Sequence, residues 1–109
     1  MHDTDILQTQ LCIDGIPSVL WGNPSDQLYL AVHGNLSHKQ DEVILLLAEQ
    51  AAGVGHQVLS FDLPGHGERA GDGFCSVRQS VDDLRTILAY AKQRYRVINL
   101  FACSMGAYF

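Results

Sequence analysis

The clearest sign of chemistry in the sequence is a serine near the end of the chain. Ser104 follows a mostly apolar segment, Arg96–Phe101, that is expected to form a strand. The residues two positions before and after this serine are small, Ala102 and Gly106. A sharp turn from a strand into a helix requires small residues at these two places, and it lifts the serine hydroxyl above the edge of the sheet. We therefore predict that Ser104 is a nucleophile in a strained turn with a positive φ.

Cys103 is the competing nucleophile, because a thiolate is intrinsically stronger than a hydroxyl. With Cys103 at the centre of the turn, the residues two positions away would be Phe101 and Met105, which are too large. The spacing therefore favours Ser104, and Cys103 is expected to be a small buried apolar residue.

A serine that attacks a carbonyl group also needs two backbone N–H groups directed at the developing oxyanion. Met105, directly after the nucleophile, is expected to donate one of them. The other is expected from His33-Gly34-Asn35, which follows the apolar run Gln27–Val32. We predict Asn35 as this donor, with Leu36 as the alternative. A plain turn is the other interpretation, since Gly and Asn both tolerate a positive φ.

The elements that must position these residues alternate between strands and helices. Strands are predicted at 7–13, 17–21, 27–32, 57–61 and 96–101. Helices are predicted after capping patterns at 37–40 and 76–79. The first helix is apolar from Val43 to Ala48 and is expected to be covered on more than one side, ending near Gly53 and Gly55. The second has one apolar face, made of Val77, Val81, Leu84, Leu88 and Ala91.

This order predicts an α/β fold with a mostly parallel sheet and helices on both faces. The two leading strands, joined by the turn Asp14-Gly15, are expected to form an antiparallel hairpin at one edge. If the fourth and fifth strands lie on opposite sides of the third, the sheet has a topological switch point between the third and fifth strands. Ligands bind at such a switch point in open α/β sheets, and Asn35 and Ser104 would meet there.

Composition narrows the function classes. The chain has 109 residues, 47% hydrophobic and 17% charged, which suits one globular domain. A net charge of −5 argues against binding to nucleic acid or to an anionic membrane. No apolar run approaches the ~18 residues of a membrane span, and the polar N-terminus does not resemble a signal peptide. Three cysteines without a C-x-x-C pair predict neither disulfides nor a zinc site, and favour the cytoplasm.

A nominal dinucleotide fingerprint, Gly65-x-Gly67-x-x-Ala70, follows the fourth strand. It must open a helix in order to hold a pyrophosphate, whereas here Gly71-Asp72-Gly73 prolongs a polar loop. We therefore expect no nucleotide, and no cofactor or metal ion of any kind.

The chain resembles the N-terminal half of an α/β-hydrolase. Three stretches carry the resemblance, in the order typical of that family: Tyr29–Asn35, Phe61–Gly67 and Ala102–Ala107. The resemblance implies the strand order 1-2-4-3-5, and serine-dependent hydrolysis of a small-molecule ester, thioester or amide. It also implies that residues 1–109 form a partial α/β-hydrolase domain ending in the helix after the nucleophile.

One part of the family pattern is missing. The triad acid and histidine follow the serine in this family, yet only five residues follow Ser104 and none is acidic or histidine. We expect His33 to anchor its loop, His66 to belong to a glycine-rich turn and Asp62 to cap its own loop, so none of them replaces the triad.

Two alternatives remain. The chain is part of a larger hydrolase and is inactive alone, or it is a non-catalytic remnant that binds or self-associates through the open edge of its last strand.

Overall fold

The computed structural model describes residues 7–33, 38–40, 42–63, 69 and 77–102. The elements in chain order are β1 (Gln8–Ile13), β2 (Ile16–Trp21), β3 (Gln27–Val32), α1 (Glu42–Gly53), β4 (Gln57–Phe61), α2 (Val77–Lys92) and β5 (Val97–Ala102). Every strand lies within one residue of its predicted bounds, and β3 and β4 have the predicted bounds themselves. Short apolar runs bounded by polar turn residues mark strands well, because β-forming residues fill the strand and turn-forming residues end it.

The five strands form one mixed sheet in the order β1-β2-β4-β3-β5, which confirms the predicted order. β3 pairs in parallel with both β4 and β5, whereas the pairings β1–β2 and β2–β4 are antiparallel. The predicted hairpin is present, and its turn residues Asp14 and Gly15 both have a positive φ, 49° and 84°. Asparagine, aspartate and glycine are the residues that tolerate this conformation, so the turn chemistry agrees with the fold.

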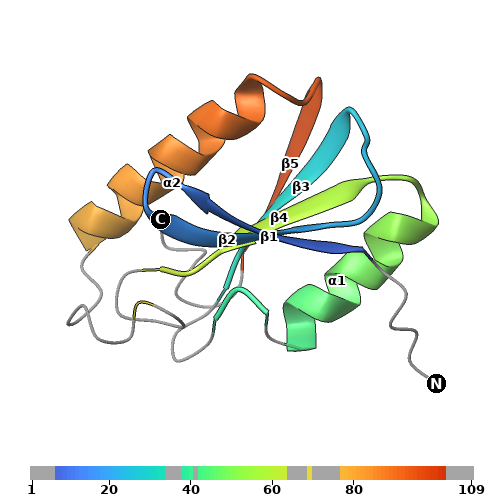
Figure 1. Cartoon of the computed structure of the whole chain (residues 1–109), viewed down its shortest axis with the longest axis horizontal. Helices are drawn as coiled ribbons and strands as arrows, with labels where there is room; N and C mark the ends of the chain where they lie inside the picture. Colours follow the sequence, from blue (N-terminus) through green and yellow to red (C-terminus); the bar gives the residue numbers. More distant parts are fainter. Residues whose placement is uncertain (1–6, 34–37, 41, 64–68, 70–76, 103–109) are drawn as a thin grey trace.

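The helices cover opposite faces of the sheet, as predicted (Figure 1). Alternate residues of a strand point to opposite faces, and β3 separates its side chains in this way. Leu28, Leu30 and Val32 belong to the cluster that includes Ile87 of α2. Ala31 belongs to a second cluster, built around α1. The sheet is therefore the central layer between two hydrophobic cores.

Helix α1 differs from its prediction, since it buries one face and not several. Its buried residues are Ile44, Ala48 and Ala51, spaced by four and three residues as one helical stripe requires. Val43 and Leu46 remain 46% and 55% exposed. An apolar run in the sequence does not by itself show how many neighbours a helix has in the fold.

Helix α2 contains all the residues of its predicted face but is rotated away from that face. The buried positions are Ser80, Asp83, Ile87 and Ala91. Leu84 and Leu88 are only partly buried against the core. The buried Asp83 is paired with Arg69, and this ion pair allows a charged residue to occupy the inner face.

Strand β5 lies at the end of the sheet and is partly exposed. Asn99 and Leu100 are exposed, and Leu100 is 62% exposed. In the described part of the chain no strand pairs with the outer edge of β5, so the expected open edge is present there. None of the described helices is long and apolar enough to cross a membrane.

Candidate functional site

The carboxyl ends of β3, β4 and β5 meet at one edge of the sheet. Val32, the last residue of β3, is in register with both Phe61 of β4 and Ala102 of β5. The strands that lead into the three stretches of the family resemblance therefore end side by side. β4 and β5 lie on opposite sides of β3, which confirms the predicted switch point, the place where α/β sheets bind ligands.

The predicted site residues themselves, Ser104, Met105 and Asn35, lie outside the described residues, as do Cys103 and His66. The structure does describe where the chain departs toward them. Ala102, two residues before Ser104, ends β5 and is paired with Val32, three residues before Asn35. The strained turn, the oxyanion-hole donors and the choice of nucleophile remain predictions.

His33 is fully buried directly after β3. Its Nε2 atom accepts a hydrogen bond from the backbone N–H of Leu63, at 3.0 Å. The predicted anchoring role is therefore confirmed, because this bond ties the end of β3 to the end of β4. A ring nitrogen that accepts an N–H carries no proton, and its lone pair is already engaged. This Nε2 is therefore not available to take a proton from a serine.

Asp62 binds a lysine that the sequence analysis did not single out. The Lys39 ammonium lies 2.8 Å from Oδ2 of Asp62, and the Lys39 backbone N–H donates to Oδ1 at 2.9 Å. The side chains of the pair are only 4% and 0% exposed. The carboxylate thus reaches across to the loop after β3. The loop that Asp62 was expected to cap, 64–67, lies outside the described residues, so that expectation stays a prediction. A buried carboxylate requires a cation or several donors, and Lys39 supplies both.

Ser60 holds Lys39 from a second direction. Its hydroxyl, buried in β4, donates to the Lys39 carbonyl oxygen at 2.7 Å. The same hydroxyl oxygen accepts a hydrogen bond from the indole Nε1–H of Trp21, at 3.0 Å. The backbone N–H, carbonyl and ammonium of Lys39 are thus all bound to residues at the end of β4. In the sequence, the sign of this polar network was Asp62 itself, an acidic residue directly after a buried strand.

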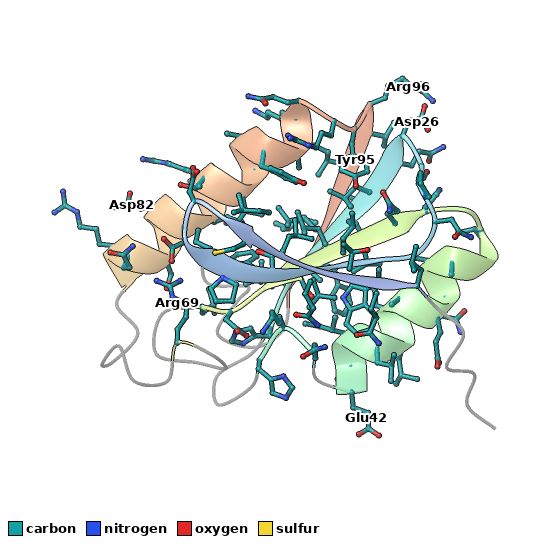
Figure 2. All side chains as sticks on the ribbon, in the orientation of Figure 1. Asp26, Glu42, Arg69, Asp82, Tyr95 and Arg96 are labelled. Carbon is teal, nitrogen blue, oxygen red and sulfur yellow. The ribbon has the colours of Figure 1, made fainter. Side chains whose placement is uncertain are left out.

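Arg69 connects the chain after β4 to helix α2. Its guanidinium lies 2.6 Å from Oδ2 of Asp83 and donates to the backbone carbonyl of Asp62 at 3.2 Å. Gln79 donates to the other Asp83 oxygen at 3.0 Å. Figure 2 shows Arg69 near the N-terminal end of α2. These contacts extend the polar network from the sheet edge to the first turns of the helix.

A separate cluster of polar side chains lies at the opposite end of the strands, where β3 and β5 begin (Figure 2). Asp26 and Arg96 form an exposed ion pair there at 3.0 Å. The Tyr95 hydroxyl donates to Oε1 of Gln57 at 2.6 Å. Burial, with the nearby Tyr90, raises the pKa of Tyr95 above its ordinary value, and Arg94 partly opposes this shift. This end of the strands is remote from the switch point and has no part in the candidate site.

Comparisons with solved structures reproduce this architecture. An esterase from an Arctic intertidal metagenomic library shares 25% identity at a TM-score of 0.74, over 97% of this chain and 54% of its own. The protein TT1662 of Thermus thermophilus shares 26% identity at a TM-score of 0.76, over 96% and 49%. A thioesterase domain from the curacin biosynthetic pathway shares 24% identity at a TM-score of 0.68, over 95% and 37%.

In comparisons of sequence, the chain matches neither a family model nor a curated protein. The structural likeness nevertheless extends over nearly all of this chain, and the chain spans about half the length of the first two structures. The strand order, the helices on both faces and the switch point are all consistent with this structural likeness. The chain therefore has an α/β-hydrolase fold and is related to the esterases that share it.

Proposed function

We propose that this chain supplies the nucleophile and the oxyanion hole of a serine hydrolase that acts on a carboxylic ester, thioester or amide. The Ser104 hydroxyl attacks the substrate carbonyl and gives up its proton to a base. The carbonyl oxygen becomes an oxyanion, bound by the backbone N–H groups of Met105 and Asn35. Collapse of this intermediate expels the alcohol, thiol or amine and leaves an acyl-enzyme, which water hydrolyses in the second half of the reaction.

The observation that carries the proposal is the register of Val32 with Phe61 and Ala102. It brings the ends of the strands that precede Asn35 and Ser104 in the sequence side by side at the switch point, which supports the proposal. The esterase and thioesterase among the similar structures support a hydrolase. A strand followed by a small-x-Ser-x-small sequence is the context in which a serine nucleophile is expected.

The proposal includes a base from outside these 109 residues. Residues 105–109 contain neither an acid nor a histidine, and the Nε2 lone pair of His33 is engaged by Leu63. A serine without a base is almost wholly protonated at neutral pH and is a weak nucleophile. The proposal therefore assigns neither the triad acid nor the triad histidine to residues 105–109 or to His33.

The test is turnover of a p-nitrophenyl ester by the purified 109-residue chain and by the longest native gene product that contains it. We expect the chain alone to be slower by a factor on the order of 10⁴ or more, as for a triad that lacks its base. In the longer product, Ser104→Ala should abolish turnover and covalent labelling by a fluorophosphonate. Cys103→Ala is the matched control and should leave both intact.

Two results would count against this proposal. Loss of labelling in Cys103→Ala but not in Ser104→Ala would move the nucleophile to the cysteine. Turnover by the 109-residue chain at the rate of ordinary esterases, abolished by Ser104→Ala, would mean that His33, His66 or a second copy supplies the base.

A second candidate is a non-catalytic module that self-associates. It is favoured by the outer edge of β5, where Leu100 is 62% exposed. A hollow of about 260 Å³ adjoins this edge on the α2 side, lined by Leu30, Leu84, Leu88, Lys92, Ile98 and Leu100. Open strand edges with apolar neighbours are sites of pairing with other chains.

We also propose a cytoplasmic location for either candidate. Three cysteines without a C-x-x-C pair do not suit a disulfide framework. Cys12 is a free, exposed thiol on β1, and such thiols persist in a reducing compartment.

A further inference from the structure

The hollow between α2 and β5 combines an apolar floor with a charged margin. Of its six lining residues, five are apolar and the sixth is Lys92. Leu100, which belongs to the edge strand β5, is 62% exposed. Exposed apolar surface that is bordered by polar residues is typical of a site of protein contact. The charge around the hollow and the other exposed apolar residues of the chain indicate what binds there.

The side of the hollow formed by α2 carries a row of basic residues. Arg78, Arg85 and Lys92 are exposed and follow one another at intervals of seven residues, which places them along one stripe of the helix. Five of the seven basic residues of the chain lie between positions 78 and 96, against two of the twelve acidic residues. The other two basic residues are held in ion pairs with carboxylates. Positive charge is therefore concentrated beside the hollow.

Helix α1 exposes the complementary combination on the opposite face of the sheet (Figure 1). Val43 and Leu46 are 46% and 55% exposed. Glu42 and Glu49 lie four residues before and three residues after Leu46, which places both carboxylates beside it on the helix surface. Figure 2 shows the Glu42 side chain pointing away from the sheet. Helix α1 contains no lysine or arginine, so its exposed stripe, residues 42, 43, 46 and 49, is apolar and acidic.

We propose that the exposed stripe of α1 in one copy of this chain docks in the hollow between α2 and β5 of a second copy. An amphipathic helix that lays its apolar residues in an apolar groove is a recurring mode of recognition. The lengths agree, because the stripe and the α2 side of the hollow, Leu84 to Lys92, each span two helical turns, roughly 10–12 Å. The carboxylates of the stripe would then lie against the basic row, which favours this pairing over others.

The placement of the two surfaces determines the kind of assembly. They are different surfaces on opposite faces of the sheet, so the contact is heterologous and each copy retains a free stripe or a free hollow. Such contacts produce rings or open chains and do not stop at a dimer. Pairing of two β5 edges would instead use the same surface twice and stop at a dimer. The proposed contact is thus distinct from edge pairing, and it does not involve the reaction proposed for Ser104.

The test is sedimentation equilibrium of the purified 109-residue chain and of two variants, each of which blocks one surface. Leu46→Lys places a charge in the stripe, and Leu100→Lys places one at the hollow. Val54→Lys is the matched control, since Val54 is 67% exposed beyond the end of α1. We expect wild type and Val54→Lys to associate beyond a dimer, and each blocked variant to associate at least about 10-fold more weakly.

Mixing the two blocked variants gives the sharpest result. Leu46→Lys retains an intact hollow and Leu100→Lys retains an intact stripe, so an equimolar mixture should form a 1:1 heterodimer that grows no further. A monomeric wild type, wild-type association of Leu46→Lys, or the absence of a heterodimer from the mixture would each overturn the inference. If Leu100→Lys does not fold, Lys92→Glu, a reversal of an exposed charge, takes its place in the mixture.

Salt provides a readout that needs no variant. At 1 M salt the Debye length falls to about 3 Å, so the attraction between the acidic stripe and the basic row is screened and wild-type association should weaken. Association that is unchanged or stronger at 1 M salt would overturn the inference. Ser104→Ala should associate as the wild type does, so failure of the proposed serine mechanism and failure of this contact are observed separately.

Discussion

At the residue scale, the carboxyl edge of the sheet depends on a few buried polar side chains, each held by partners distant in the sequence. Ser60 is the junction of this network, because one hydroxyl group serves two neighbours. It accepts from the Trp21 indole and donates to the Lys39 carbonyl. A buried polar group that loses its partner costs more than the bond itself contributed. The residues of this edge are therefore expected to be sensitive even to small substitutions.

Ser60→Ala is expected to lower the free energy of unfolding by about 2 kcal/mol, since it leaves the buried Trp21 N–H without its acceptor. Ser25→Ala is the matched control, because the Ser25 hydroxyl accepts a single, partly exposed bond from the Gln27 N–H. This control should lose about 1 kcal/mol or less. Urea denaturation of both variants measures the difference, and equal losses would contradict the junction role.

Tyr95 gives the fold a dependence on alkaline pH. Burial raises its pKa above the ordinary value of 10.0, so the folded state keeps the phenolic proton to a higher pH than the unfolded state. The stabilisation is then fully present below pH 10.0 and is lost as pH rises through the folded pKa. Tyr95→Phe should remove this loss along with the bond to Gln57. Unfolding in urea at neutral and alkaline pH measures it, and a constant difference between the two proteins would contradict it.

At the scale of elements, each helix contributes one face to the core, and α1 does so through a narrow stripe. Ile44 is fully buried in this stripe, whereas Leu46 is 55% exposed two positions later. Ile44 and Leu46 are isomeric apolar residues two positions apart, yet the first is buried and the second is exposed.

Ile44→Ala is expected to cost about 2–5 kcal/mol, because it removes buried methyl groups and leaves a cavity. Leu46→Ala should change the free energy of unfolding by less than about 0.5 kcal/mol, as surface substitutions do. Thermal or urea unfolding compares the two variants. A similar loss for Leu46→Ala would mean that a further element covers this side of α1.

At the scale of the whole molecule, the two outer strands of the sheet, β1 and β5, have different surroundings. β1 pairs with β2 in a short hairpin, while β5 presents Leu100 beside an apolar hollow. In the larger structures that this chain resembles, it corresponds to about half of the length. The surface near β5 is therefore the place at which to test the proposed self-association.

Leu100→Lys should weaken any self-association of the purified 109-residue chain, because an exposed lysine on an edge strand opposes pairing with another chain. Val54→Lys is the matched control, a second exposed apolar residue at the end of α1, and should have no effect. Sedimentation equilibrium over a range of concentrations measures both. Equal association of wild type and Leu100→Lys would exclude this edge as the contact.

The sequence by itself determined where the strands lie. Their order was what the resemblance to the α/β-hydrolases implied, and the place of the switch point depended on that order. Strand runs such as Gln27–Val32 and Gln57–Phe61 are marked by their own apolar residues and by the polar turns that end them. The same local signals indicate a sharp turn at Ser104, because the requirement for small neighbours is a matter of adjacent residues.

Only the tertiary structure decided which polar residues are buried. Lys39 lies in a polar stretch of the sequence, where an exposed side chain is expected. In the structure it is buried against the carboxylate of Asp62, 23 residues away in the sequence. Asp83 occupies the inner face of α2 because Arg69, from a different segment, neutralises it. The burial of a charge depends on a partner that is distant in the sequence, and no local pattern contains that partner.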